Sequence, residues 1–153
     1  MWIFIITIIV GIVITLLAKK NQHNQTLSTS ASENESFADN VLYTFEIVGE
    51  QAYQENLRKI AGVKNKQSKF IEVMARVFSE PLNQFDKHAI KVEINGLTVG
   101  YLSKEDARQL AGKIIDTNVA AVINGGWLDE EDEGSYGVKL AIQSLNDLQG
   151  NSS

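Results

Sequence analysis

The sequence contains no cysteine, one proline and two histidines among its 153 residues. Without cysteine, the chain has no disulfides, thiolate metal sites, cysteine nucleophiles or lipidated amino-terminal cysteine. The histidines, His23 and His88, lie far apart in the sequence, so they do not suggest a clustered set of metal ligands. No nucleophile-elbow motif accompanies His88, which disfavours a Ser-His-Asp triad. We therefore expect a protein that is not an enzyme and that needs no metal or other cofactor.

The charge balance also limits the possible partners. Nineteen acidic residues outnumber fourteen basic ones, which gives a formal net charge of −5. A protein that binds nucleic acid through its overall charge would be basic, so any such contact here must come from a local patch. Lys59, Lys64, Lys66 and Lys69 are one candidate patch for phosphates or anionic lipid headgroups, although they also suit an ordinary solvated loop.

The first part of the chain is strongly apolar. Residues 2–18 hold no charged side chain, and as a helix they would extend over about 25 Å, close to the thickness of a bilayer core. A cleaved signal peptide would have positive charge before this run and a small-x-small site after it, and neither is present. Residues 1–20 are thus predicted to form a transmembrane anchor that contacts lipid through residues 2–18. Because Lys19 and Lys20 follow the run, the positive-inside rule predicts a single-pass protein of the cell membrane whose domain faces the cytoplasm.

The rest of the chain divides into a linker and one domain. Residues 21–40 are rich in Asn, Gln, Ser and Thr, a composition typical of a flexible polar linker. Residues 41–145 are expected to form the domain, and residues 146–153 a disordered tail. About 105 residues can bury one small hydrophobic core.

Strand patterns dominate the domain. Alternating apolar residues predict half-buried strands over 71–77 and 90–94, and Asn95-Gly96 predicts a type I′ hairpin between Ile94 and Leu97. Further strands are predicted over 41–48, 97–99, 119–123 and 136–142 from their β-branched and aromatic content. The pattern favours a mainly β fold, either a small barrel or an α+β sheet.

Two short helices interrupt these strands. The first carries Tyr53, Leu57, Ile60 and Ala61 on one face and ends at Gly62. The second begins at Ser103, which forms a capping pattern with Asp106. Its predicted apolar stripe consists of Ala107, Leu110, Ala111 and Ile114.

Two neighbouring segments resemble the signature of the HIRAN domain. They read EPLNQFDKHAIKV over 80–92 and VGYLSKEDA over 99–107. Three shorter pieces agree with the family in order, namely IVGE over 47–50 with Tyr53 and Leu57, AVINGGW over 121–127 and GSYGVKL over 134–140. The resemblance covers roughly residues 43–144 and implies a small OB-like six-stranded barrel with two short helices, a fold that binds ligands across one face and its loops.

The resemblance also implies a function and a set of site residues. HIRAN domains of fork-remodelling translocases hold the 3′ end of single-stranded DNA, with bases between aromatic rings and a carboxylate at the terminal hydroxyl. Matched by position, Phe85 corresponds to a ring, Asp86 to the carboxylate and Lys104 to a basic residue near phosphate. Tyr101 and Tyr136 correspond to further rings. The family has an Arg-Tyr pair where this chain has Gln51 and Ala52, and Tyr53 is the nearest aromatic residue.

Other interpretations of the same residues remain open. Phe85 also suits a packing residue at a strand entry, and Asp86 suits a turn cap that binds backbone N–H groups. The acidic run over 129–133 would repel phosphate if it lay close to the binding face. The sequence thus supports two functions: a membrane-tethered, non-catalytic module that binds single-stranded nucleic acid weakly, or a membrane-anchored module that binds a protein or peptide through the same barrel face.

Overall fold

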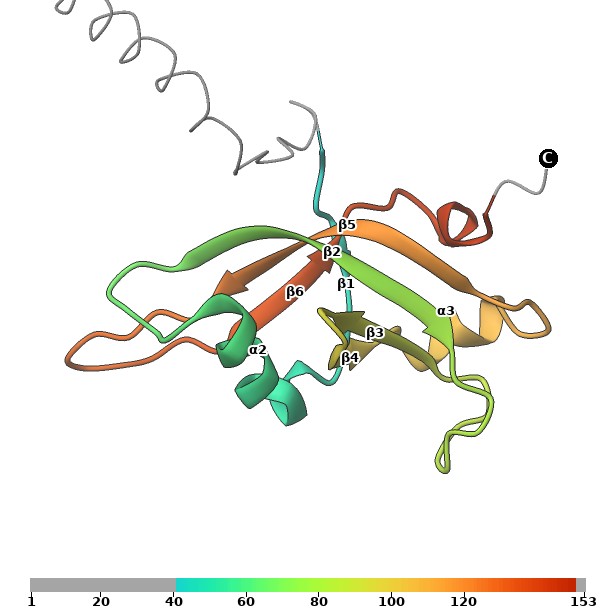
Figure 1. The fold of residues 1–153 in the computed structure, drawn as a ribbon, viewed down its shortest axis with the longest axis horizontal. Coiled ribbons are helices and arrows are strands. Elements are labelled where there is room, and N and C mark those ends of the chain that lie inside the picture. The colour runs from blue at the N-terminus through green and yellow to red at the C-terminus, as the bar shows by residue number, and fades with distance from the viewer. Residues whose placement is uncertain (1–40, 151–153) are drawn as a thin grey trace, which may run out of the picture. The chain divides into compact units, whose positions relative to one another are not determined.

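The computed structural model describes residues 41–150, which form a mainly β domain around one core (Figure 1). Its sheet has six antiparallel strands in the order β1-β6-β5-β2-β3-β4. The strands are β1 (Phe45–Glu46), β2 (Lys69–Ser79), β3 (Ile90–Ile94), β4 (Leu97–Tyr101), β5 (Asp116–Gly125) and β6 (Tyr136–Leu140). The helices are η1 (Glu50–Tyr53), α2 (Gln54–Ala61), α3 (Lys104–Gln109) and η2 (Leu145–Leu148).

The sheet curls around the core as a half-barrel. Alternate residues of β2 and β3 point inward, and Ala75, Val77, Ile90, Val92 and Ile94 are buried. The alternation predicted for these two strands is therefore confirmed. Removing these side chains from water is the main force that holds the sheet in its curled form.

The two edges of the sheet meet at one glycine. Val48 and Tyr101 exchange two backbone hydrogen bonds, with N···O distances of 2.8 and 2.9 Å. A Cβ atom on Gly100 would lie 2.7 Å from both the Ile47 side chain and the Val48 carbonyl oxygen. Only glycine lets the segment after β1 approach β4 so closely.

The predicted hairpin turn is confirmed. Asn95 and Gly96 have φ angles of 52° and 74° and connect Ile94 of β3 to Leu97 of β4. Both turn residues occupy the left-handed region that a type I′ turn requires. The turn thereby fixes the register of the hairpin that carries Tyr101.

The second predicted helix starts as expected but ends early. The Ser103 side chain accepts a hydrogen bond from the Asp106 N–H at 3.1 Å, which confirms the cap. The prediction that the apolar stripe continues to Ile114 is wrong. The helix ends at Gln109, Gly112 takes a φ of 83°, and Ile114 is 95% exposed while Ile115 is buried.

Several predicted boundaries also differ. The strand predicted over 41–48 is reduced to Phe45–Glu46, because residues 47 and 48 turn toward β4. The strand predicted over 119–123 is longer, since β5 pairs with β2 over its whole length. The tail predicted from residue 146 includes part of η2, and Leu148 is only 1% exposed. Packing against the core therefore extends the domain to at least this residue.

The predicted anchor over 1–20 and linker over 21–40 lie outside the described residues, as do residues 151–153. Between residues 41 and 150, none of the helices has both the length and the apolar character of a membrane span.

Candidate functional site

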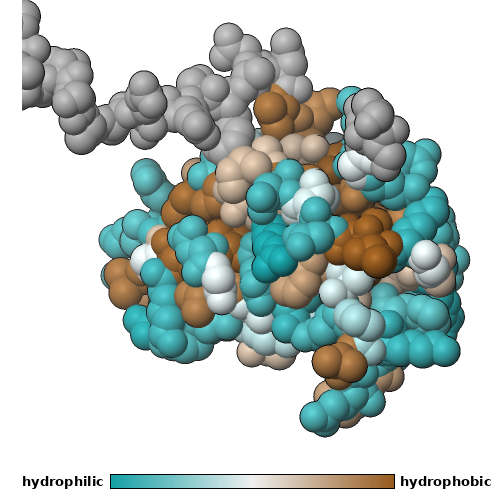
Figure 2. All heavy atoms as spheres, turned by 45° about the vertical axis from the view of Figure 1, so that its right-hand side comes forward, coloured by the Kyte–Doolittle hydropathy of each residue, from teal (hydrophilic) through white to brown (hydrophobic). Residues whose placement is uncertain are grey.

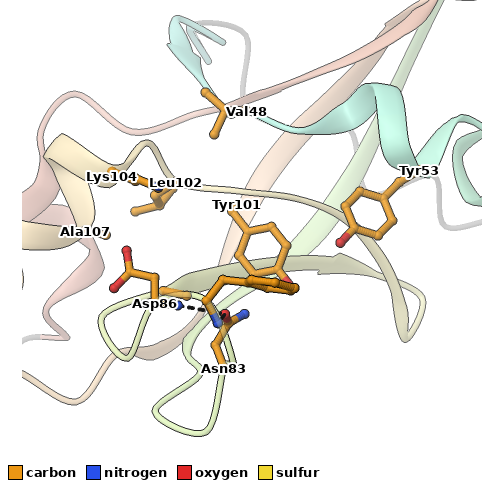
Figure 3. A pocket seen from close by; sticks show the side chains of 10 residues that line it. Val48, Tyr53, Asn83, Asp86, Tyr101, Leu102, Lys104 and Ala107 are labelled. Carbon is orange, nitrogen blue, oxygen red and sulfur yellow. Dashed lines mark hydrogen bonds between the residues drawn. The ribbon is translucent and has the colours of Figure 1, made fainter.

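Five of the six residues predicted from sequence to form a site line one pocket: Tyr53, Phe85, Asp86, Tyr101 and Lys104. The pocket has a volume of about 310 Å³ and opens to solvent beside the loop between β2 and β3 (Figure 3). We call it the aromatic pocket, and the loop over residues 80–89 the pocket loop. Its remaining lining residues are apolar or amide-bearing, namely Val48, Asn83, Ala89, Leu102 and Ala107.

Three aromatic rings come to the pocket from three elements. Tyr53 ends η1 and Tyr101 ends β4, and their ring centroids lie 6.3 Å apart at a tilt of 45°. Phe85 belongs to the pocket loop and is 96% exposed. Because its ring is exposed, Phe85 is not the packing residue that a strand entry suggests. It is available to stack on a planar group.

A single asparagine shapes the part of the loop that carries Phe85 and Asp86. Asn83 Oδ1 accepts hydrogen bonds from the N–H groups of Phe85 and Asp86, at 2.9 and 3.1 Å (Figure 3). Its Nδ2 donates to Glu80 Oε2 at 2.6 Å. An Asn side chain that binds the backbone two and three residues ahead closes a tight local turn.

Glu80 ties this turn to the sheet. Its carboxylate accepts hydrogen bonds from Asn83 and from the Tyr101 hydroxyl, the latter at 3.2 Å, and forms an ion pair with Lys91 of β3. Burial alone would raise the pKa of Glu80, but these three donors outweigh it and lower the pKa below its ordinary value. Burial raises the pKa of Tyr101, and its neighbours Tyr53 and Glu80 raise it further. The Tyr101 hydroxyl therefore stays protonated and acts as a donor.

Asp86 and Lys104 lie on the side of Tyr101 that faces away from Tyr53 (Figure 3). Asp86 Oδ1 accepts the His88 N–H at 2.8 Å. This is the turn-capping role considered from the sequence. Within residues 41–150, no hydrogen bond reaches its other carboxylate oxygen. Asp86 can therefore cap the turn and still accept a hydrogen bond from a ligand.

The structure does not place Tyr136 at the predicted site. It is 2% exposed and does not line the aromatic pocket. Its hydroxyl donates to the Gly62 carbonyl at 2.6 Å, and a Cβ atom on Gly126 would lie 2.1 Å from its ring. Gln54 also binds both the N–H and the carbonyl of Tyr136 at 2.9 Å. These contacts make Tyr136 a core residue that cannot stack on a base.

The acidic run, residues 129–133, lies at the opposite end of the domain from the pocket loop (Figure 1). We call it the acidic loop. Glu133 forms an ion pair with Lys64 at 3.0 Å, so Lys64 is not available to bind phosphate. The loop does not line the aromatic pocket. The repulsion of phosphate considered from the sequence therefore has little effect at the pocket, since exposed charges are screened over about 8 to 10 Å.

Sequence reasoning missed the residues that hold the site in place. Glu80 and Asn83 stand in the same signature as Phe85 and Asp86, but their roles depend on side-chain hydrogen bonds. One signal was present, because an Asn in a loop sequence is typical of an Asx turn, in which its side chain binds the backbone two residues ahead. Tyr53 is the residue of η1 that lines the pocket, whereas Gln51 and Ala52 do not.

The pocket carries one carboxylate and one ammonium group among its lining residues. Between residues 41 and 150, no three His, Asp or Glu side chains come together as a possible metal site. Comparison with models of protein families, with curated proteins and with solved structures finds no match.

Proposed function

We propose that this domain is a HIRAN-like module with an OB-like fold that binds the 3′ end of a single-stranded nucleic acid, DNA in the first instance, without catalysing a reaction. The observation that carries the proposal is the convergence of Tyr53, Phe85, Tyr101, Asp86 and Lys104 on one pocket. These residues come from η1, the pocket loop, β4 and α3. Local structure alone would not bring them together.

The chemistry of the pocket suits a nucleotide at a strand end. An exposed ring such as Phe85 stacks on any base. The unbonded oxygen of Asp86 accepts a hydrogen bond from a terminal hydroxyl and would repel a terminal phosphate. Lys104 supplies the positive charge for the adjoining phosphodiester. We expect weak binding because this is the one lysine among the lining residues.

The alternative is a protein- or peptide-binding module that uses the same pocket. It is favoured by the apolar lining residues Val48, Leu102 and Ala107, which would accept an apolar side chain. On the face that Figure 2 turns forward, hydrophobic residues lie in separate patches among hydrophilic ones. This face therefore offers a partner small apolar areas rather than one broad apolar surface.

Fluorescence anisotropy with the full chain in mild detergent tests the proposal. The probes are short oligothymidylates that carry either a free 3′ hydroxyl or a 3′ phosphate. Phe85→Ala should weaken binding about tenfold, because a base–ring stack contributes about 1–3 kcal/mol. Leu82→Ala is the matched control, since Leu82 is a similarly exposed apolar residue of the same loop that does not line the pocket.

Asp86→Asn tests the end preference separately. Asparagine keeps the acceptor for the His88 N–H but removes the negative charge, so it should reduce the preference for a free 3′ hydroxyl while the loop stays folded. If the wild-type chain does not bind single strands even at low salt, the nucleic-acid proposal fails and the peptide-binding alternative replaces it.

The proposed module is tethered to the cell membrane through residues 2–18, with the domain on the cytoplasmic side. The support is the uncharged apolar run followed by Lys19 and Lys20. Mass spectrometry of the chain isolated from membranes should find residues 1–18 still attached. A mature chain that begins after residue 18 would contradict the tether.

A further inference from the structure

A second pocket adjoins the aromatic pocket on the other side of the pocket loop. It has a volume of about 410 Å³, and we call it the basic groove. The two hollows share Ala89 and Ala107 as lining residues. Successive residues of the loop face different sides, since Asp86 lines the aromatic pocket while Lys87 and His88 line the groove. The two hollows therefore adjoin each other across one short stretch of backbone.

The charge of the groove is opposite to that of the whole chain. Its charged lining residues are Lys87 and Lys113, and no carboxylate lines it. The chain as a whole has a formal net charge of −5. Two lysines without a neutralising carboxylate, next to a site that would hold a strand end, form a local patch of the kind that phosphate contacts require.

Both walls of the groove are fixed by hydrogen bonds. The Ser79 N–H donates to the Ile115 carbonyl at 2.9 Å, and the Ile115 N–H donates to the Ser79 hydroxyl at 3.0 Å. These two bonds hold the turn after α3 against the end of β2. The Lys113 N–H donates to the Leu110 carbonyl at 3.0 Å, and the Lys113 ammonium donates to Gln149 at 2.5 Å. Gln149 is neutral, so this hydrogen bond is not an ion pair.

Ile114 provides an apolar surface in the same groove. It is 95% exposed although it lies next to Ile115, which is fully packed. An exposed isoleucine beside two lysines offers a base or sugar an apolar contact while its phosphates meet the ammonium groups. Single-strand sites combine a positively charged groove with aromatic side chains that stack on bases, and here Ile114 offers an apolar contact in place of a ring.

We propose that the basic groove binds the nucleotides that precede the strand end held in the aromatic pocket. The strand crosses the pocket loop at Ala89, Lys87 and Lys113 contact its phosphates, and Ile114 packs against a base or sugar. This inference rests on the proposed function. It adds that the full site takes a strand several nucleotides long, of which the aromatic pocket holds the terminal stretch and the basic groove holds the nucleotides before it.

The test compares a short and a long strand on the full chain in mild detergent. The probes are oligothymidylates of about three nucleotides, which is less than the smallest site size of an OB fold, and of about ten nucleotides, which exceeds it. The wild-type chain should bind the longer strand more tightly. Replacing Lys87 and Lys113 with Gln should weaken the longer strand on the order of tenfold and lower its salt slope by about 0.7 per lysine. Binding of the short strand should stay within about twofold, which also shows that the pocket remains folded.

A matched double variant, Lys59→Gln with Lys66→Gln, removes the same charge from exposed lysines that line neither hollow. It should leave both strands unaffected. Equal weakening by the two double variants would mean that only net charge matters, and the groove would have no specific role. Equal affinity of the wild-type chain for short and long strands would also overturn the inference, while the proposed function would stand. Absence of binding at both lengths would overturn the proposed function itself, and this inference with it.

Discussion

The pocket loop and the acidic loop use the same local device. In the pocket loop, Asn83 Oδ1 accepts hydrogen bonds from the N–H groups two and three residues ahead. In the acidic loop, Asp129 Oδ1 accepts from the same two positions, both at 2.9 Å. The two turns differ in what holds them to the sheet. The pocket loop is fixed through Glu80 to two strands, whereas the acidic loop has a side-chain ion pair to Lys64 in another loop.

That difference decides which loop can form a site. Anchoring through Glu80 and Asn83 holds the backbone of Phe85 and Asp86 beside the pocket, so a ligand need not order this part of the loop on binding. The acidic loop presents exposed carboxylates and lines neither the aromatic pocket nor the basic groove, and the nearby Tyr136 is packed in the core. Of these two Asx turns, the one that Glu80 ties to the sheet is the one beside the aromatic pocket.

The largest expected effect is at Tyr136, the aromatic residue that follows the acidic loop. Tyr136→Ala should lower the free energy of unfolding by about 3 to 5 kcal/mol, because it leaves a cavity and removes the hydrogen bond to Gly62. Urea unfolding followed by circular dichroism measures the loss. Phe85→Ala is the control and should change stability by less than about 0.5 kcal/mol, since its ring is exposed. Equal losses at the two positions would contradict the distinction between a core ring and a site ring.

Gly100→Ala should have the next largest effect and should act on the pocket side. The added Cβ atom would lie 2.7 Å from the Ile47 side chain and the Val48 carbonyl oxygen, so the two sheet edges must separate. We expect a loss of about 1 to 3 kcal/mol in stability, as for other overpacked sites. Gly150→Ala, with no neighbouring atom within 4 Å of the new Cβ, should be neutral. Wild-type stability of Gly100→Ala would show that the edges are not held together at this glycine.

Glu80→Gln tests the anchor of the pocket loop and should depend on pH. At neutral pH the variant should lose about 1 to 2 kcal/mol, because a charged acceptor of three hydrogen bonds becomes a neutral amide. The folded-state pKa of Glu80 lies below its ordinary value. Its carboxylate therefore stabilises the fold above the unfolded-state pKa, and this stabilisation is lost as the pH falls through the lower folded-state pKa.

The difference in stability between wild type and Glu80→Gln should therefore narrow as the pH falls from about 5 to about 3. Unfolding midpoints measured for both proteins across this range provide the test. The other carboxylates with lowered pKa values are common to both proteins and cancel in the difference. A gap that stays constant with pH would mean that the charge of Glu80 does not hold the loop.

The smallest effect is expected at the tip of the acidic loop. Replacing Glu130 and Glu131 with Gln should change stability by less than about 0.5 kcal/mol, because both side chains are exposed and make no side-chain hydrogen bond within residues 41–150. Binding of a short strand should also stay the same, since the loop lies at the far end of the domain (Figure 1). A clear gain in binding would show that the acidic loop repels the ligand after all.

The sequence by itself determined the local elements and most of the candidate residues. Alternation defined β2 and β3, Asn95-Gly96 defined the hairpin between β3 and β4, and Ser103 defined the start of α3, because each depends on interactions between residues close in the chain. The position of Phe85 and Asp86 in one motif also identified the loop that lines the pocket.

Only the tertiary structure decided which aromatic residues belong to the core and which to a surface. Tyr136 and Tyr101 both stand in strands, yet one packs against Gly126 and the other closes a pocket with Phe85. That outcome depends on the sheet order and on the close contact at Gly100, and both join segments that are far apart in the sequence. Such contacts have no local sequence signature, because burial depends on what the rest of the chain places beside a residue.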